Sequence, residues 1–64
     1  MFINIKNGVH RGTTIAGVFP LVKPHNGKFV TVKTNAKAPF TVENARINVA
    51  EDEFNYCDAA GTQI

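Results

Sequence analysis

The chain has one cysteine, Cys57, no tryptophan and no long hydrophobic run. A single cysteine excludes an internal disulfide, and no cluster of Cys and His has the spacing of a zinc site. No stretch approaches the ~20 apolar residues of a transmembrane helix. The N-terminus lacks the basic and apolar regions of a secretory signal. An unpaired thiol without an export signal predicts a protein of the reducing cytoplasm. The initial Met and the lack of a tag-like segment lead us to expect a complete small protein.

Acidic residues are almost absent from the first fifty positions. Residues 1–50 carry seven basic side chains and one carboxylate, a net charge of +6, whereas residues 51–64 carry four carboxylates and no cation, a net charge of −4. The basic part predicts a polyanionic partner. The acidic part has three interpretations. It imitates phosphate or binds a basic protein, it folds onto the basic part of its own or a sister chain, or it is a solvated turn before aromatic residues dock.

Short alternating segments between turn residues predict an all-β protein. The expected strands are Phe2–Lys6, Thr13–Val22, Lys28–Thr34, Phe40–Val42 and Ile47–Val49, followed by a strand or helical turn near residues 54–57. We expect turns at Asn7-Gly8 and at residues 24–27, and a 3₁₀ turn at residues 43–45.

The connections are too short for anything but a small sheet structure. Residues 1–64 are therefore expected to form one domain, a five- to six-stranded SH3-like barrel or a shortened OB-type barrel, with residues 51–64 as an acidic segment packed on it. At this length only ~60% of the unfolded surface is buried, so the core must be thin. The expected core residues are Ile3, Ile5, Ile15, Phe19, Leu21, Val30, Val32, Phe40, Val42, Ile47, Val49 and Phe54.

The segment Thr13–Val22 carries apolar residues on both faces of its expected strand. Such a strand is covered on both sides or bends between two sheets, and Gly17 offers the bend. Pro20 cannot donate a ladder bond, which places the strand at an edge or makes it irregular there. This strand is also the expected contact if the protein is a homo-oligomer.

The stretch Ile5–Gly12 resembles the opening of KOW-type SH3-like domains, which occur in ribosomal proteins and transcription elongation factors. Gly8, Arg11 and Gly12 match the first part of the motif, while Ile15 stands where its last glycine is expected and Gly17 comes two positions late. Residues 40–49 also look like the last part of such a barrel, with a short strand, a 3₁₀ turn and a final strand. The resemblance implies loops that contact RNA, DNA or a protein of the transcription or translation machinery. Alternatively, the glycines are ordinary turn residues.

Basic side chains at strand ends and in loops form the expected nucleic-acid site. Its members are Lys6, Arg11, Lys28, Phe29, Lys33 and Lys37. Phe29 and Lys33 put an aromatic ring and a cation on one strand face, which could stack a base and hold a phosphate. The alternatives are that Phe29 is buried under the C-terminal segment or a second subunit, and that the lysines only keep the surface solvated.

No residue set predicts catalysis, so we expect a protein that is not an enzyme and has no cofactor or metal. His10 and His25 fall in expected loops without carboxylate or cysteine at ligand spacing. Cys57 has no nearby histidine in sequence and is expected to be a small core residue. A hydrolase site at the paired carboxylates of residues 51–53 would need a polar cleft that so small a chain can hardly build.

Two functions of different classes remain open. The first is a nucleic-acid-binding module or accessory factor of transcription or translation, bound mainly through phosphates. The second is a protein-binding adaptor or inhibitor, of the phage or mobile-element type, that blocks a host factor. Its expected contact residues are Glu51, Asp52, Glu53 and Tyr56. A structural subunit of a larger assembly is a third possibility. No membrane partner is expected.

Overall fold

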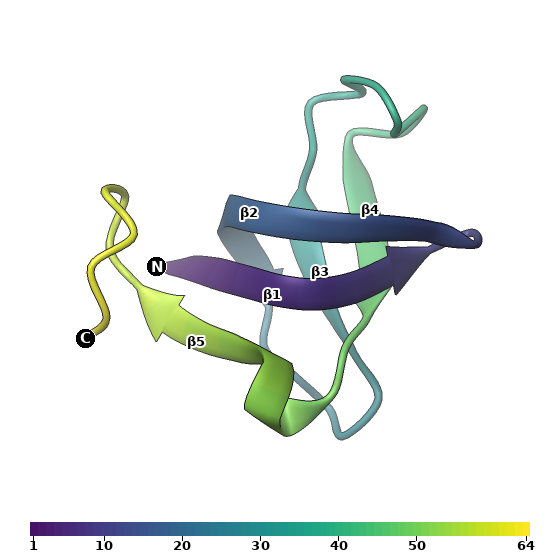
Figure 1. The fold of residues 1–64 in the computed structure, drawn as a ribbon. Coiled ribbons are helices and arrows are strands. Elements are labelled where there is room, and N and C mark those ends of the chain that lie inside the picture. Colours follow the sequence, from purple (N-terminus) through teal and green to yellow (C-terminus); the bar gives the residue numbers. More distant parts are fainter.

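The computed structural model describes residues 1–64 and shows an all-β chain, as the sequence predicted (Figure 1). Its elements are β1 (Phe2–His10), β2 (Thr13–Lys23), β3 (Phe29–Lys33), β4 (Asn44–Asn48), the 3₁₀ turn η1 (Glu51–Glu53) and β5 (Phe54–Cys57). No helix is long and apolar enough to cross a membrane.

The five strands form one antiparallel sheet in which β1 has three partners. The strand order is β2-β3-β4-β1-β5, and β1 pairs with β2 as well. The pairings therefore run in a circuit through β1, β2, β3 and β4. Strand β5 pairs with residues 2–5 of β1, on the edge opposite β2. The circuit is closed by a single residue pair between β1 and β4, Val9 opposite Asn48.

The hairpin between β1 and β2 turns at Arg11 and Gly12. Both residues have positive φ, 50° and 80°. Positive φ at both central residues is typical of the type I′ turn, whose twist matches that of the flanking strands. Strand β1 therefore continues to His10, beyond the end at Lys6 that the alternation predicted.

The expected turn at Asn7-Gly8 is wrong, because both residues lie within β1. The register between β1 and β2 shifts between Ile5 and Gly8, which marks a bulge. Gly8 is buried, and its φ is not positive. A Cβ atom at this position would lie 2.5 Å from Cγ2 of Ile47 and 2.9 Å from Cγ2 of Ile5. Glycine is needed here for space rather than for its conformation.

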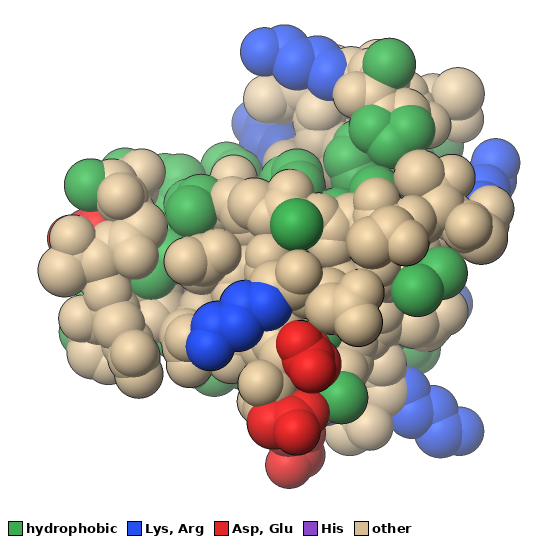
Figure 2. All heavy atoms as spheres, in the orientation of Figure 1, with side chains coloured by type: hydrophobic (Ala, Val, Ile, Leu, Met, Phe, Trp, Pro, Cys, Tyr) green, Lys and Arg blue, Asp and Glu red, His purple; other side chains and the backbone are tan.

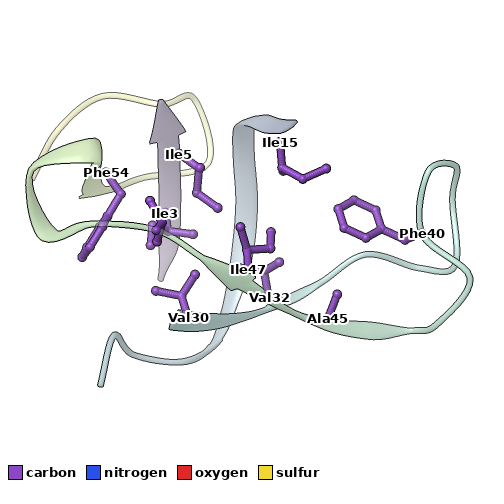
Figure 3. Packing of buried hydrophobic residues seen from close by; sticks show 10 residues of the cluster. Ile3, Ile5, Ile15, Val30, Val32, Phe40, Ala45, Ile47 and Phe54 are labelled. Atoms are coloured by element: carbon purple, nitrogen blue, oxygen red, sulfur yellow. The ribbon is translucent and has the colours of Figure 1, made fainter. Parts of the chain in front are cut away.

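Ten apolar side chains form a single core between the strands (Figure 3). They are Ile3, Ile5, Ile15, Val30, Val32, Phe40, Ala45, Ile47, Val49 and Phe54. Nine of these were expected, and Phe19 and Leu21 pack against the cluster half-buried. The prediction that Val42 belongs to the core is wrong, because the residue is 38% exposed, and the buried Ala45 was not predicted. Cys57 is fully buried, as predicted for a small core residue.

The segment between β3 and β4 is a loop, so the expected strand Phe40–Val42 and the expected 3₁₀ turn at residues 43–45 are wrong. Asn35 and Ala36 have positive φ, and the amides of Thr34 and Ala36 donate to the carbonyls of Glu43 and Val42. These hydrogen bonds close the loop on itself, and the Phe40 ring is buried in the core. That ring lies 6.0 Å from Phe19 and 5.0 Å from the His10 ring, between centroids.

The acidic segment is packed against β1. The 3₁₀ turn η1 begins this segment, and β5 follows it directly. Ile5 pairs with Phe54 and Phe2 pairs with Cys57. The last residues fold back on β5 through a bridge between Cys57 and Gln63. The yellow C-terminal turn therefore lies near the N-terminus in Figure 1.

We expect Gly8→Ala to lower the free energy of unfolding by about 1–3 kcal/mol, the usual cost of overfilling a packed site. Urea denaturation measures this loss. The control is Gly12→Asn at the exposed turn, where nothing lies within 4 Å and asparagine tolerates positive φ. Equal stability of the Gly8→Ala variant and the wild type would contradict the close packing against Ile47.

Candidate nucleic-acid interface

The paired strands β3 and β4 present one face to the core and the other outward. The inward side chains include Val30, Val32, Ala45 and Ile47. Because side chains alternate along a strand, the residues between them point outward. The outward side chains form three cross-strand pairs, Phe29 with Asn48, Thr31 with Arg46 and Lys33 with Asn44. We call these six residues the β3–β4 face.

An aromatic ring and a guanidinium group meet on this face. The Cζ atom of Arg46 lies 5.1 Å from the centroid of the Phe29 ring. Such a cation–π contact contributes about 0.5–1 kcal/mol at an exposed site. Phe29 is half-buried and Arg46 is exposed. The structure thus covers the Phe29 ring with Arg46.

A groove of about 480 Å³ runs beside this pair. We call it the basic groove; its lining residues are His10, Arg11, Phe29, Val42, Asn44, Ala45, Arg46 and Asn48. The tip of the β1–β2 hairpin thus forms one wall and β4 the other. Two arginines line the groove, and no carboxylate does. A concave surface with cations, amides and an aromatic ring has the chemistry to hold phosphates and stack bases.

His10 ties the hairpin to β4. Its Nδ1 lies 3.0 Å from the carbonyl oxygen of Arg46. A carbonyl oxygen only accepts, so Nδ1 carries the proton and donates. The contact spans the open side of β4, where the strand ladder to β1 has only one residue pair. The two walls of the basic groove are therefore held together next to Arg46.

The structure brings together only part of the predicted site. Arg11 and Phe29 line the basic groove, and Lys33 lies on the same face, opposite Asn44. Lys28 lies in the connection that precedes β3, and Lys37 in the loop between β3 and β4. Neither lines the groove.

Lys6 lies in β1, away from the other predicted cations. It stands next to Asn55 of β5: in the preferred orientation of that side-chain amide, the Asn55 oxygen accepts a hydrogen bond from Nζ of Lys6 at 3.3 Å. In Figure 2 most acidic side chains gather at the lower edge beside one basic side chain, and the other basic side chains in that view stand apart. The cations do not converge on the face shown.

Three polar groove residues were missed by the sequence analysis: Asn44, Arg46 and Asn48. The signal that could have found them is the alternation Asn44-Ala45-Arg46-Ile47-Asn48, in which every second residue is polar. The expected strand began only at Ile47, so Arg46 was not assigned to a strand face.

A second groove, of about 420 Å³, has the opposite charge. We call it the acidic groove; it is lined by His25, Glu51, Phe54, Asn55, Tyr56, Gln63 and Ile64. Glu51 is its carboxylate, and it has no lysine or arginine. Of the residues predicted for protein binding, Glu51 and Tyr56 line it. Asp52 is exposed on η1 and Glu53 is half-buried there, and neither lines the groove.

His25 organises the wall of the acidic groove. Its Nε2 lies 2.8 Å from the carbonyl oxygen of Val49, and the amide of Gly27 donates to its Nδ1 at 3.3 Å. Because the carbonyl accepts and the amide donates, Nε2 is the donor and Nδ1 the acceptor. Its backbone amide donates to the hydroxyl of Tyr56, and its ring lies 4.8 Å from that of Phe54. The histidine expected in a loop is thus a structural link.

Neither groove contains a metal-ligand cluster. No group of three or more His, Cys, Asp and Glu side chains is placed to hold a metal ion. Comparison with protein-family models, with curated proteins and with solved structures finds no match to this chain. The functional argument therefore depends on the two grooves and their charges.

We expect His25→Ala to lower the free energy of unfolding by about 1–3 kcal/mol, because the Val49 carbonyl loses its donor in a partly buried place. Thermal or urea unfolding measures the effect. The comparison is His10→Ala, whose bond to Arg46 is exposed, so that water can replace the lost donor. A loss at His10 as large as at His25 would contradict the structural role of His25.

Proposed function

We propose that this chain is a non-enzymatic nucleic-acid-binding module and that it binds through the basic groove and the β3–β4 face. The observation that carries this proposal is the Arg46 guanidinium over the Phe29 ring in a groove with a second arginine and no carboxylate. A basic groove attracts a polyanion and releases its counterions. The net charge of +6 in residues 1–50 has the same sign.

Each side chain of the site has a distinct part in the proposed binding. The Arg46 guanidinium, which lies over the Phe29 ring, provides a planar cation on which a base can stack. Arg11, which lines the groove, and Lys33, which lies opposite Asn44, neutralise phosphates. The amides of Asn44 and Asn48 can donate and accept at base edges. Phe29 and Lys33 are four residues apart, about 13 Å along β3, which suits an extended single strand with little sequence readout.

We further propose that the sheet is a small SH3-like barrel. Support comes from the circuit of pairings through β1 to β4 and from the order of a short strand, a 3₁₀ turn and a final strand in β4, η1 and β5. The KOW-like resemblance adds Arg11 and Gly12 at the tip of the β1–β2 hairpin. On this proposal the protein is a cytoplasmic accessory factor of transcription or translation.

Binding to short single-stranded RNA and DNA, measured by fluorescence anisotropy at ~50 mM salt, tests the proposal. We expect Arg46→Lys to weaken binding by about tenfold, because it keeps the charge but loses the planar stacking surface. Lys28→Ala, which removes a cation outside the groove, is the control and should change affinity much less.

Two outcomes would count against different parts of the proposal. Absence of binding to either nucleic acid at ~50 mM salt would overturn the function, since counterion release favours binding most at low salt. A loss for Lys28→Ala equal to that for Arg46→Lys would keep the function but move it away from the basic groove. Arg46 is exposed, so its replacement should leave folding intact.

The acidic groove favours a second candidate function, a protein-binding adaptor or inhibitor of a host factor. Glu51 without a cation, beside Phe54 and Tyr56, would receive a basic and apolar protein segment. In pull-downs from nuclease-treated lysate, we expect the wild-type protein to capture a specific protein partner and the Glu51→Lys variant not to capture it. Loss of every specific partner after nuclease treatment would leave only the nucleic-acid function.

A further inference from the structure

One strand edge of the sheet has no partner over seven residues. Strand β2 pairs with β1 from Thr13 to Pro20, and its pairing with β3 begins only at Leu21. None of the backbone hydrogen bonds made by loops and turns reaches residues 13–19. The outer edge of β2 from Thr13 to Phe19 is therefore open, and it forms the upper edge of the dark blue strand in Figure 1.

The direction of the free backbone groups follows from the β1–β2 ladder. The amide of Leu21 donates to the carbonyl of Met1, so Leu21 points toward β1. Backbone groups alternate between the two edges of a strand, so the odd-numbered residues from Thr13 to Phe19, within the ladder with β1, also point toward β1. Thr14, Ala16 and Val18 present their amides and carbonyls to the open edge. Pro20 ends this row, because it has no amide hydrogen.

No charged side chain protects this edge against pairing. Natural edge strands carry charges, are very short or are covered, because a bare edge is a template for another strand. Residues 13–19 contain no charged side chain, and four are β-branched. The outward side chains are exposed, with Val18 39% exposed and Val22 44% exposed. The edge accepts a neutral, β-rich strand.

We propose that the occupant of this edge is the same strand of a second copy of this chain, paired antiparallel about a two-fold axis at Ala16. Ala16 is the midpoint of the open segment, and it is one of the residues whose amide and carbonyl point outward. In this register the open edges of the two copies pair over their whole length, and Thr14 of each copy lies opposite Val18 of the other. Each of the three outward-pointing residue pairs, at Thr14, Ala16 and Val18, exchanges two backbone hydrogen bonds with the other copy, which gives about six in all.

The side chains of β2 fit this arrangement. At the two-fold axis Ala16 lies opposite Ala16 of the other copy, and these two small side chains fit opposite each other. Thr14 and Val18 form two β-branched cross-strand pairs, which stabilise antiparallel strands. Beyond the segment, the Arg11-Gly12 turn lies at one end and Pro20 at the other, so the ladder ends there. No residue of β2 lines the basic groove, so both copies keep that groove open.

The test measures self-association and edge protection in the same protein. We expect sedimentation velocity between ~10 µM and ~1 mM to show a shift from monomer toward dimer with increasing concentration. Amide hydrogen exchange by NMR, at the same concentrations, should slow about tenfold at Ala16 and Val18 once nine-tenths of the chains are dimeric. The amides of Ile15 and Phe19, which point toward β1, should be protected at every concentration.

Two variants separate edge pairing from other contacts. Ala16→Lys places like charges directly opposite each other at the axis and should keep the chain monomeric throughout the range. Ala16→Ser, its matched control, should dimerise as the wild type does. The Ala16 side chain is exposed, so Ala16→Lys should fold, which the wild-type pattern of protected amides in β1 verifies.

Three results would overturn the proposal. They are a wild-type monomer at ~1 mM, exchange at Ala16 and Val18 that does not change with concentration, and a dimer that Ala16→Lys leaves intact. In the first case the edge serves another partner or none. In the other two cases the copies meet through a different surface.

Discussion

Strand β1 is the constraint on which the other elements of this protein depend. It pairs with β2, β4 and β5, and β3 reaches it through β2 and β4. Its inward side chains Ile3 and Ile5 are almost completely buried. Where β1 comes closest to β4, the space is so small that only glycine fits, at Gly8 against Ile47. A chain with a ten-residue core has no second strand able to replace these contacts.

The same strand connects the two charged grooves. At its C-terminal end, His10 and Arg11 form a wall of the basic groove. Its N-terminal half pairs with β5, whose residues Phe54, Asn55 and Tyr56 line the acidic groove. The two grooves share no residue: two of the seven cations, Arg11 and Arg46, line the basic groove, and Glu51 is the carboxylate of the acidic groove. The acidic segment borders Lys6 and leaves Arg11 and Arg46 uncovered, so the basic groove is available to a polyanion.

The proposed nucleic-acid surface and the proposed self-association use different parts of the sheet. The first uses the outward faces of β3 and β4, where an arginine covers an aromatic ring. The second uses the backbone edge of β2, which carries no charge. An uncharged edge favours pairing with an equally uncharged strand, whereas a groove with two arginines favours a polyanion. One small domain can therefore present two surfaces with different chemistry.

The sequence alone determined what depends on neighbouring residues. Alternation of apolar and polar side chains placed Ile3, Ile5, Val30 and Val32 in the core of an all-β chain, since a strand repeats every two residues. Residues 24–27 indicated a turn, and the lack of a nearby histidine indicated that Cys57 is a core residue. The unequal charge of residues 1–50 and 51–64 predicted a polyanionic partner and left three interpretations of the acidic segment open.

Only the tertiary structure decided what depends on segments distant in sequence. Gly8 resembles a turn residue until Ile47 is placed beside it, and Phe40 resembles a strand residue until its loop closes over the core. The cation–π contact of Arg46 with Phe29 requires the register of β3 against β4, which no local pattern contains. Alternation specifies which face a side chain takes, but the pairing of strands specifies which side chains meet, and that pairing is set by packing of the whole chain.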